Sequence, residues 1–135
     1  MDDHISEIFG NDRRRLVRRK VRLAVSVSII ERDAPAESLQ RPLTVLGYTR
    51  DISASGLALI VPAIRSDISE RGNYLLRIIL ALPTGDVSMN AIAVRHERLD
   101  AASPDIGYLI GAVISEMSES ERNLYLEYLR TLGVN

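Results

Sequence analysis

An alternation of apolar and polar residues begins at Val21, and it constrains the fold of this chain more than any other feature. Apolar side chains occupy every second position up to Ile29, and the positions between them carry Arg22, Ala24, Ser26 and Ser28. A period of two is typical of a β-strand with one buried face and one solvated face. The segment therefore requires a sheet around it, with a core on one side.

Five further segments are β-like, and polar stretches rich in turn residues separate them. We expect strands at 43–50, 57–61, 74–82, 87–96 and 106–114. The loops between them include "RDAPAESLQRP" (32–42), a connection at 62–72 with one helical turn, and "PTGD" (83–86), which predicts a hairpin turn. A short helical turn is also expected at residues 5–9.

The C-terminal region changes to helical periodicity. Ser118 followed by Glu121 matches a capping box, in which each side chain satisfies the other's backbone N–H. A helical stripe follows, and Gly133 suits the position just after a helix; the stripe consists of Leu124, Tyr125, Tyr128, Leu129 and Leu132. Six strands and one amphipathic helix in 135 residues predict one mostly β domain, a six-stranded antiparallel barrel whose open end or side the helix covers.

Positive charge is concentrated before the first strand. Seven of the ten residues from Arg13 to Arg22 are basic, although the whole chain has a net charge of −1. The rest of the chain contains the other 10 basic residues and all 18 acidic ones, so its net charge is −8. Sixteen of the 17 basic residues are arginine, whose planar guanidinium grips phosphate and stacks on aromatic rings. This distribution indicates a local anion site on an acidic body.

Several kinds of function lack their residues here. The chain has no cysteine, and His4 and His96 stand in no metal-binding pattern, so no metal site is expected. No phosphate-binding glycine loop, nucleophile elbow or nucleophile–base pair is present, so we expect a protein that is not an enzyme. The start "MDDHISEIFG" is not a signal peptide and no apolar run is long enough for a membrane span, so we expect a cytoplasmic protein without membrane insertion.

The stretch "DISASG" (51–56) interrupts two expected strands and carries hydrogen-bonding side chains. Asp51 and Ser53 can accept hydrogen bonds, and Gly56 permits a positive φ or a close approach of backbone. A tight connection stabilised by an Asx-turn at Asp51 is one interpretation. A ligand-binding loop is the other.

Together, the arginine run and this stretch resemble the PilZ domain family. The family pattern is RxxxR before the first strand and [DN]xSxxG between the second and third, and the chain has "RRLVR" (14–18) and "DISASG" (51–56) there. The last strand with Gly111 and the following helix resemble the family as well, so the resemblance covers roughly residues 13–132. We expect a flexible N-terminal segment at 1–12 and a PilZ-like domain at 13–135. Arg15 and Arg19 share the RxxxR spacing, so the register of the motif stays open.

The resemblance implies binding of cyclic di-GMP, a bacterial second messenger, with no other cofactor. Arg14 and Arg18 would clamp phosphate and stack on guanine, while Asp51 would accept from the N1–H and N2–H groups of a guanine. Ser53 would help to hold the base or a phosphate, and Gly56 would let the loop pass close beneath the ring. Arg13 and Arg15 would bind a second nucleotide, which favours two ligands per chain. Ligand binding would order the arginine arm (13–20) over the barrel.

By this resemblance the chain is a receptor that couples the second-messenger level to a partner protein. The resemblance implies an unidentified effector protein in motility, polysaccharide or secretion machinery as the partner, and it leaves monomer and homodimer open as oligomeric states. The alternative is a PilZ-like adaptor that binds protein but no nucleotide. A nucleic-acid-binding barrel is a third interpretation, which the scarcity of aromatic residues (4%) disfavours because such proteins stack bases on aromatic rings.

Overall fold

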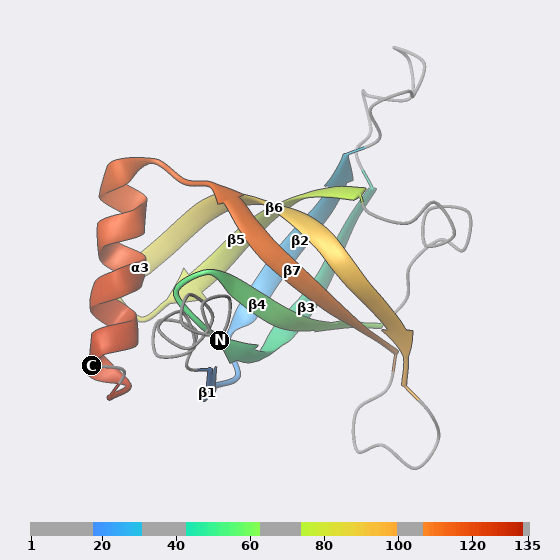
Figure 1. Ribbon diagram of the computed structural model, residues 1–135, viewed down its shortest axis with the longest axis horizontal. Helices are drawn as coiled ribbons and strands as arrows, with labels where there is room; N and C mark the ends of the chain where they lie inside the picture. Colours follow the sequence, from blue (N-terminus) through green and yellow to red (C-terminus); the bar gives the residue numbers. More distant parts are fainter. Residues whose placement is uncertain (1–17, 31–42, 63–73, 100–106, 134–135) are drawn as a thin grey trace, which may run out of the picture.

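The alternation that begins at Val21 forms strand β2 (Ala24–Ile30), whose inward side chains Val25, Val27 and Ile29 are buried. The structure is a computed structural model that describes residues 18–30, 43–62, 74–99 and 107–133 (Figure 1). The expected helical turn at 5–9 and nearly all of the 62–72 connection lie outside these residues, as does the expected flexible segment 1–12.

Six antiparallel strands close into a barrel. Around the barrel they follow the order β3-β2-β5-β6-β7-β4, and pairing of β4 with β3 completes the circle. The strands besides β2 are β3 (Leu43–Ile52), β4 (Gly56–Val61), β5 (Tyr74–Leu82), β6 (Gly85–Arg98) and β7 (Tyr108–Glu116). A two-residue strand, β1 (Arg19–Lys20), adds to β3 opposite Asp51 and Ile52. The predicted six-stranded barrel is therefore confirmed.

Apolar side chains fill the barrel, as in other small barrels. Every strand from β2 to β7 contributes, because alternate residues of each strand point inward. The largest fully buried residues of the strands that belong to this core are Ile52, Leu57, Leu59, Leu76, Ile78, Leu80, Met89, Ile110 and Val27. The hairpin between β5 and β6 turns through Pro83 and Thr84, with Leu82 paired to Gly85, as the "PTGD" stretch predicts.

The first barrel strand begins three residues later than the alternation predicts. The buried hydroxyl of Thr49 donates to the Val21 carbonyl (2.5 Å) and accepts from the Leu23 N–H (2.9 Å). The backbone N–H of Thr49 also donates to the Leu23 carbonyl. Residues 21–23 therefore form a corner held by one threonine side chain instead of a regular ladder.

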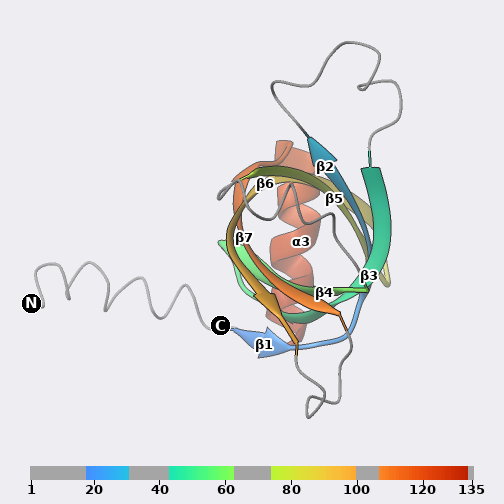
Figure 2. The same cartoon turned by 90° about the vertical axis from the view of Figure 1, so that its right-hand side faces the viewer.

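The C-terminal helix α3 (Glu119–Thr131) lies across one open end of the barrel, as the two views show (Figures 1 and 2). Tyr125 and Leu129 of α3 are buried in the barrel core. Leu124 is 42% exposed, so its assignment to the buried stripe was wrong. Successive helix positions differ by about 100°, which turns Leu124 away from the face that Tyr125 and Leu129 share. Within the described part of the chain, no helix is long and apolar enough to cross a membrane.

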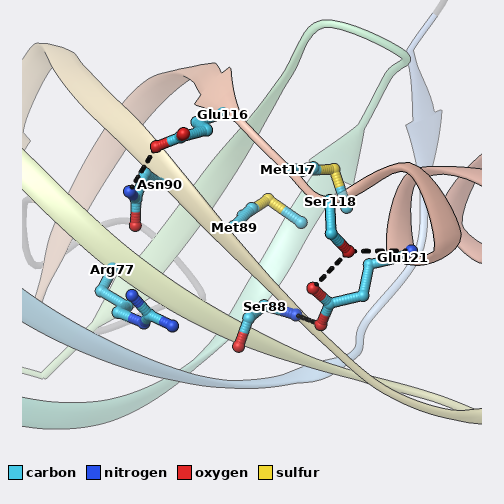
Figure 3. A pocket seen from close by; sticks show the side chains of 8 residues that line it. All are labelled: Arg77, Ser88, Met89, Asn90, Glu116, Met117, Ser118 and Glu121. Carbon is cyan, nitrogen blue, oxygen red and sulfur yellow. Dashed lines mark hydrogen bonds between the residues drawn. The ribbon is translucent and has the colours of Figure 1, made fainter.

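The start of α3 forms only half of the expected capping box. The Ser118 hydroxyl accepts from the Glu121 N–H (3.2 Å), as predicted, and donates to the Glu121 carboxylate (2.9 Å). The other oxygen of that carboxylate accepts from the Ser88 N–H of β6 (2.7 Å) (Figure 3). These hydrogen bonds, led by the one from Ser88, lower the pKa of Glu121. Glu121 thus fastens the helix to the barrel instead of capping Ser118.

Candidate ligand-binding site

The "DISASG" stretch begins inside strand β3, which contains Asp51 and Ile52, and ends at Gly56, where β4 starts. The turn between them is closed by Ser53, whose N–H donates to the Gly56 carbonyl (2.9 Å). The Ser53 hydroxyl lies 3.2 Å from both the N–H and the carbonyl oxygen of Gly56. Ser53 is only 1% exposed, so its hydroxyl serves the turn. The turn is therefore closed by Ser53, and not by an Asx-turn at Asp51.

Gly56 allows two strands to approach closely. A Cβ atom at this position would lie 2.4 Å from the Ala112 carbonyl oxygen of β7, a distance that no side chain tolerates. Gly56 is not among the glycines with positive φ, so the close approach, and not the turn conformation, requires glycine here.

The loop is also anchored from outside. The Ser55 carbonyl accepts from the Ile114 N–H of β7 (2.8 Å), and the Ser53 carbonyl accepts from the Tyr125 hydroxyl of α3 (2.6 Å). Tyr125 is fully buried, and this burial raises the pKa of its hydroxyl far above the usual range, so the group remains a donor. Two elements distant in sequence therefore fix the loop that follows Asp51.

Arg18 and Asp51 face each other at the surface. The Arg18 guanidinium lies 2.6 Å from the Asp51 carboxylate, and the two side chains are 51% and 17% exposed. Strand β1 holds this geometry, because Lys20 pairs with Asp51 and Arg19 pairs with Ile52 along β3. The Arg19 guanidinium donates to the Gly133 carbonyl beyond α3 (3.1 Å), so neighbouring arginines point to different partners.

Two β-bulges shape the surface beside this pair. Arg50 is the extra residue where the β3–β4 register shifts between Thr49 and Asp51, and Val94 is the extra residue where β6–β7 shifts between Ala93 and Arg95. Bulges re-aim side chains and are common near binding sites. The resulting registers align one row across four neighbouring strands, consisting of Asp51, Ala58, Gly111 and Arg95.

An open pocket of about 330 Å³ lies over this row. Two small residues of the row, Ala58 and Gly111, lie between the charged residues at its ends. The pocket is lined by Arg18, Arg50, Asp51, Ala58, Val94, Arg95, Leu109, Gly111, Ala112 and Val113. The arrangement offers a carboxylate acceptor, three guanidinium groups and several apolar side chains, which suits a ligand with anionic groups and hydrogen-bond donors.

The sequence-predicted residues divide into three groups. Arg18 and Asp51 meet at the pocket, and Ser53 and Gly56 lie in the loop beneath it. Arg13, Arg14 and Arg15 lie outside the described residues. The basic run also has nearby partners that the sequence did not reveal, since Arg18 pairs with Asp51 and Arg22 stacks on Tyr48 at 3.8 Å. Residues 18–20 are therefore held on the barrel, and the expectation of a free arm does not extend to them.

Two arginines of the pocket were missed by the sequence analysis. Arg50 directly precedes Asp51, and this adjacency was the only local signal for it. Arg95 has no local signal, because only the combined pairings of β3 with β4, β4 with β7 and β7 with β6 bring it into the same row as Asp51.

A second pocket, of about 300 Å³, lies where α3 begins (Figure 3). Several of its polar groups bind one another: Glu121 accepts from the Ser88 backbone N–H and from the Ser118 hydroxyl, and Asn90 donates to Glu116 (3.1 Å). We interpret this pocket as part of the contact between α3 and the barrel.

Comparison with protein families places most of the chain in one model. The family model described as PilZ domain matches residues 12–131. A comparison with curated proteins found no match.

Solved structures share the fold. The PilZ domain of YcgR from Escherichia coli, solved with c-di-GMP, has a TM-score of 0.62 at 12% identity, covering 90% of this chain and 92% of that chain. The inhibitor of motility MotI/DgrA from Bacillus subtilis has a TM-score of 0.59 at 24% identity, covering 90% of this chain and 52% of that chain. MrkH, described as a c-di-GMP-dependent transcription regulatory factor, has a TM-score of 0.57 at 16% identity, covering 87% of this chain and 50% of that chain. The chain thus spans about half the length of MotI/DgrA and of MrkH.

Proposed function

The chain belongs to the PilZ domain family, and from this premise we propose that it is a cyclic di-GMP receptor that passes the messenger level to a partner protein. PilZ domains are binding and regulatory domains, and two of the similar structures carry c-di-GMP in their descriptions. The observation that carries the proposal is the Arg18–Asp51 pair at the edge of an open pocket lined by further arginines.

This pair has the complementary chemistry of the ligand. Cyclic di-GMP offers phosphate acceptors to arginine and the N1–H and N2–H donors of guanine to a carboxylate. Without ligand, Arg18 and Asp51 satisfy each other across a solvated contact, and such exposed pairs contribute about 0–1 kcal/mol. A charge-assisted bond to the ligand contributes about 1.5–3 kcal/mol, so exchanging partners favours binding.

Each motif residue then has a role in the proposal. Asp51 accepts from the guanine edge, and Arg18 binds phosphate or guanine together with Arg14. The contact of Arg18, and not of Arg19, with Asp51 supports the 14–18 register of RxxxR. Because the Ser53 hydroxyl is buried in the turn, Ser53 acts by fixing the loop.

Arg13 and Arg15 extend the site in this proposal. They supply the additional positive charge that a second, stacked nucleotide requires, so two ligands bind per chain. Binding orders residues 13–17 against the barrel, and the ordered arm with the adjacent surface becomes the face that an effector recognises. By family membership, we expect this effector to belong to motility, polysaccharide or secretion machinery.

Calorimetric titration with cyclic di-GMP tests the proposal, with GTP and a short oligonucleotide as competing ligands. We expect a dissociation constant in the nanomolar to micromolar range, about −8 to −12 kcal/mol, and at least tenfold weaker binding for Arg18→Ala. Arg122→Ala, an exposed arginine of α3, is the matched control and should bind like the parent. No heat and no thermal shift with high micromolar ligand would instead favour the adaptor that binds protein alone.

A further inference from the structure

Arg95 lies on the far side of the pocket from Asp51, and no motif in the sequence includes it. We propose that Arg95 binds the N7 and O6 edge of the same guanine whose N1–H and N2–H edge binds Asp51. This inference rests on the proposed binding of cyclic di-GMP and adds a specificity-determining residue to it.

The strand register places the two side chains for this role. Asp51 pairs with Ala58, Ala58 pairs with Gly111, and Gly111 pairs with Arg95. Three strand spacings therefore separate the two charged residues, about 14 Å between their backbones. Both side chains line the same pocket of about 330 Å³, which lies over the row between them.

The floor between them is kept low by its small residues. A Cβ atom at Gly111 would lie 3.1 Å from the Cβ and 3.7 Å from the Cδ of Arg95. The aliphatic part of Arg95 therefore rests on the glycine, and a side chain at position 111 would displace it. Ala58 adds only a methyl group, so a base can lie over Ala58, between Asp51 and the Arg95 side chain that covers Gly111.

The guanidinium of Arg95 is hydrogen-bonded to Glu97, a neighbour on the same strand. Its Nε and one Nη donate to the same Glu97 oxygen at 3.0 and 2.6 Å. The side chains of this pair are 62% and 48% exposed, and solvated pairs of this kind contribute little to stability. Arg95 can thus exchange Glu97 for a ligand, as Arg18 can exchange Asp51.

Guanine matches this pair of side chains and adenine does not. Guanine presents two acceptors, N7 and O6, on one edge, and arginine binds them with a bidentate pair of donors. The adjacent Watson–Crick edge presents two donors, N1–H and N2–H, which a carboxylate accepts. Adenine carries an amino group beside N7, so it offers Arg95 one acceptor and one repelled donor. A base that binds Arg95 at one edge and Asp51 at the other would therefore be distinguished from adenine by two separate contacts.

A chemical double-mutant cycle tests the inference. The ligands are cyclic di-GMP and its analogue in which carbon replaces N7 of both guanines, and the proteins are the parent and Arg95→Ala. We expect Arg95→Ala to weaken cyclic di-GMP about tenfold or more, as loss of a charge-assisted bond implies. The analogue should bind the parent more weakly than cyclic di-GMP does, and this difference should shrink in Arg95→Ala.

Two further variants complete the design. Glu97→Gln removes the competing carboxylate and should tighten binding of cyclic di-GMP. Arg98→Ala, exposed on the same strand but not lining the pocket, should bind both ligands like the parent. Circular dichroism melting of each variant establishes that the fold persists.

The outcomes separate this inference from the proposed function. A parent that does not bind cyclic di-GMP overturns both. A parent that binds, with an N7 effect of equal size in Arg95→Ala, overturns the role of Arg95 alone and leaves the receptor intact.

Discussion

Asp51 is the residue on which the site depends most, and its position follows from its neighbours. The bulge at Arg50 shifts the register so that Asp51 lies opposite Ala58 at the pocket, and Lys20 pairs with it from β1. Arg18 occupies one oxygen of its carboxylate. In the proposal both oxygens accept from the guanine edge once Arg18 binds the ligand, so substitution of Asp51 and substitution of Arg18 should affect binding differently.

Substitution of these two residues should separate affinity from base selectivity. Asp51→Ala should weaken cyclic di-GMP and reduce the preference for guanine, because the carboxylate contacts the base edge. Arg18→Ala should weaken cyclic di-GMP and cyclic di-AMP alike, because phosphate is common to both. Titration of each variant with both dinucleotides measures the two ratios. Unchanged guanine preference in Asp51→Ala would place the base elsewhere.

At the scale of elements, α3 is connected to the loop that carries the motif. The Tyr125 hydroxyl holds the Ser53 carbonyl, and Glu121 holds β6 through the Ser88 N–H. The helix therefore covers the end of the barrel and supports the binding loop at the same time.

Tyr125→Phe should show how much this hydrogen bond contributes to stability and to ligand binding. It removes one buried donor and leaves the Ser53 carbonyl without it, which should cost about 1–3 kcal/mol of unfolding free energy. Cyclic di-GMP affinity should fall moderately, because the loop loses one support but Asp51 remains. Tyr128→Phe, which removes a hydroxyl from a partly buried position of the same helix, is the control. Urea unfolding and titration of both variants give the comparison, and equal stability of the two would contradict the role of this bond.

A second effect at this scale concerns the contact of His96 on β6 with Tyr74 and Tyr108. His96 Nδ1 lies 3.2 Å from the Tyr74 hydroxyl, and its ring centroid lies 5.1 Å from that of Tyr108. Burial lowers the pKa of His96, so between that pKa and the unfolded value of about 6.5 the unfolded chain binds more protons. The contribution to stability is complete above about pH 6.5 and is lost as the pH falls below it.

Melting temperatures at pH 7.5 and 5.5 test this predicted loss of stability at acidic pH. The parent should lose more stability on acidification than His96→Gln, which cannot be protonated. An equal decrease in both proteins would assign the pH dependence to other groups.

At the scale of the whole molecule, charge is divided between an arginine-rich segment and an acidic remainder. The ten residues from Arg13 to Arg22 carry seven positive charges, and the rest of the chain carries −8. Arg18 and Arg22 have partners on the barrel, whereas Arg13, Arg14 and Arg15 lie outside the described residues. This division supports a site that can accommodate more than one anionic ligand.

Ligand stoichiometry should therefore be near two per chain. Arg13→Ala should move the calorimetric stoichiometry towards one and leave the first binding event largely intact, because Arg14 and Arg18 remain. Hydrogen exchange of residues 13–17 should slow in the presence of cyclic di-GMP. A stoichiometry of one in the parent at saturation would leave Arg13 as a residue that only accelerates association.

Much of the barrel could be predicted because each signal was local. The strand at 74–82 matches β5 residue for residue, and Ser118 begins α3 as expected. Errors arose where a residue distant in sequence intervened. The Thr49 hydroxyl binds residues 21 and 23 just before β2, and the Ser88 backbone N–H binds the Glu121 carboxylate that the capping box assigns to Ser118. Of the site, Asp51 and Arg18 were named from their motifs and lie together, whereas Arg13, Arg14 and Arg15 lie outside the described residues and stay predictions.

The sequence alone determined which segments are strands, where the helix begins, and which short motifs carry carboxylate and guanidinium groups. These properties depend on backbone geometry over a few residues, so periodicity and spacing reveal them. The tertiary structure alone decided that Arg95 lies in the same row and lines the same pocket as Asp51, because that placement depends on three strand registers and two bulges. A shift of one residue in any of these registers would turn the side chain to the other face of the sheet, and no local pattern encodes the choice.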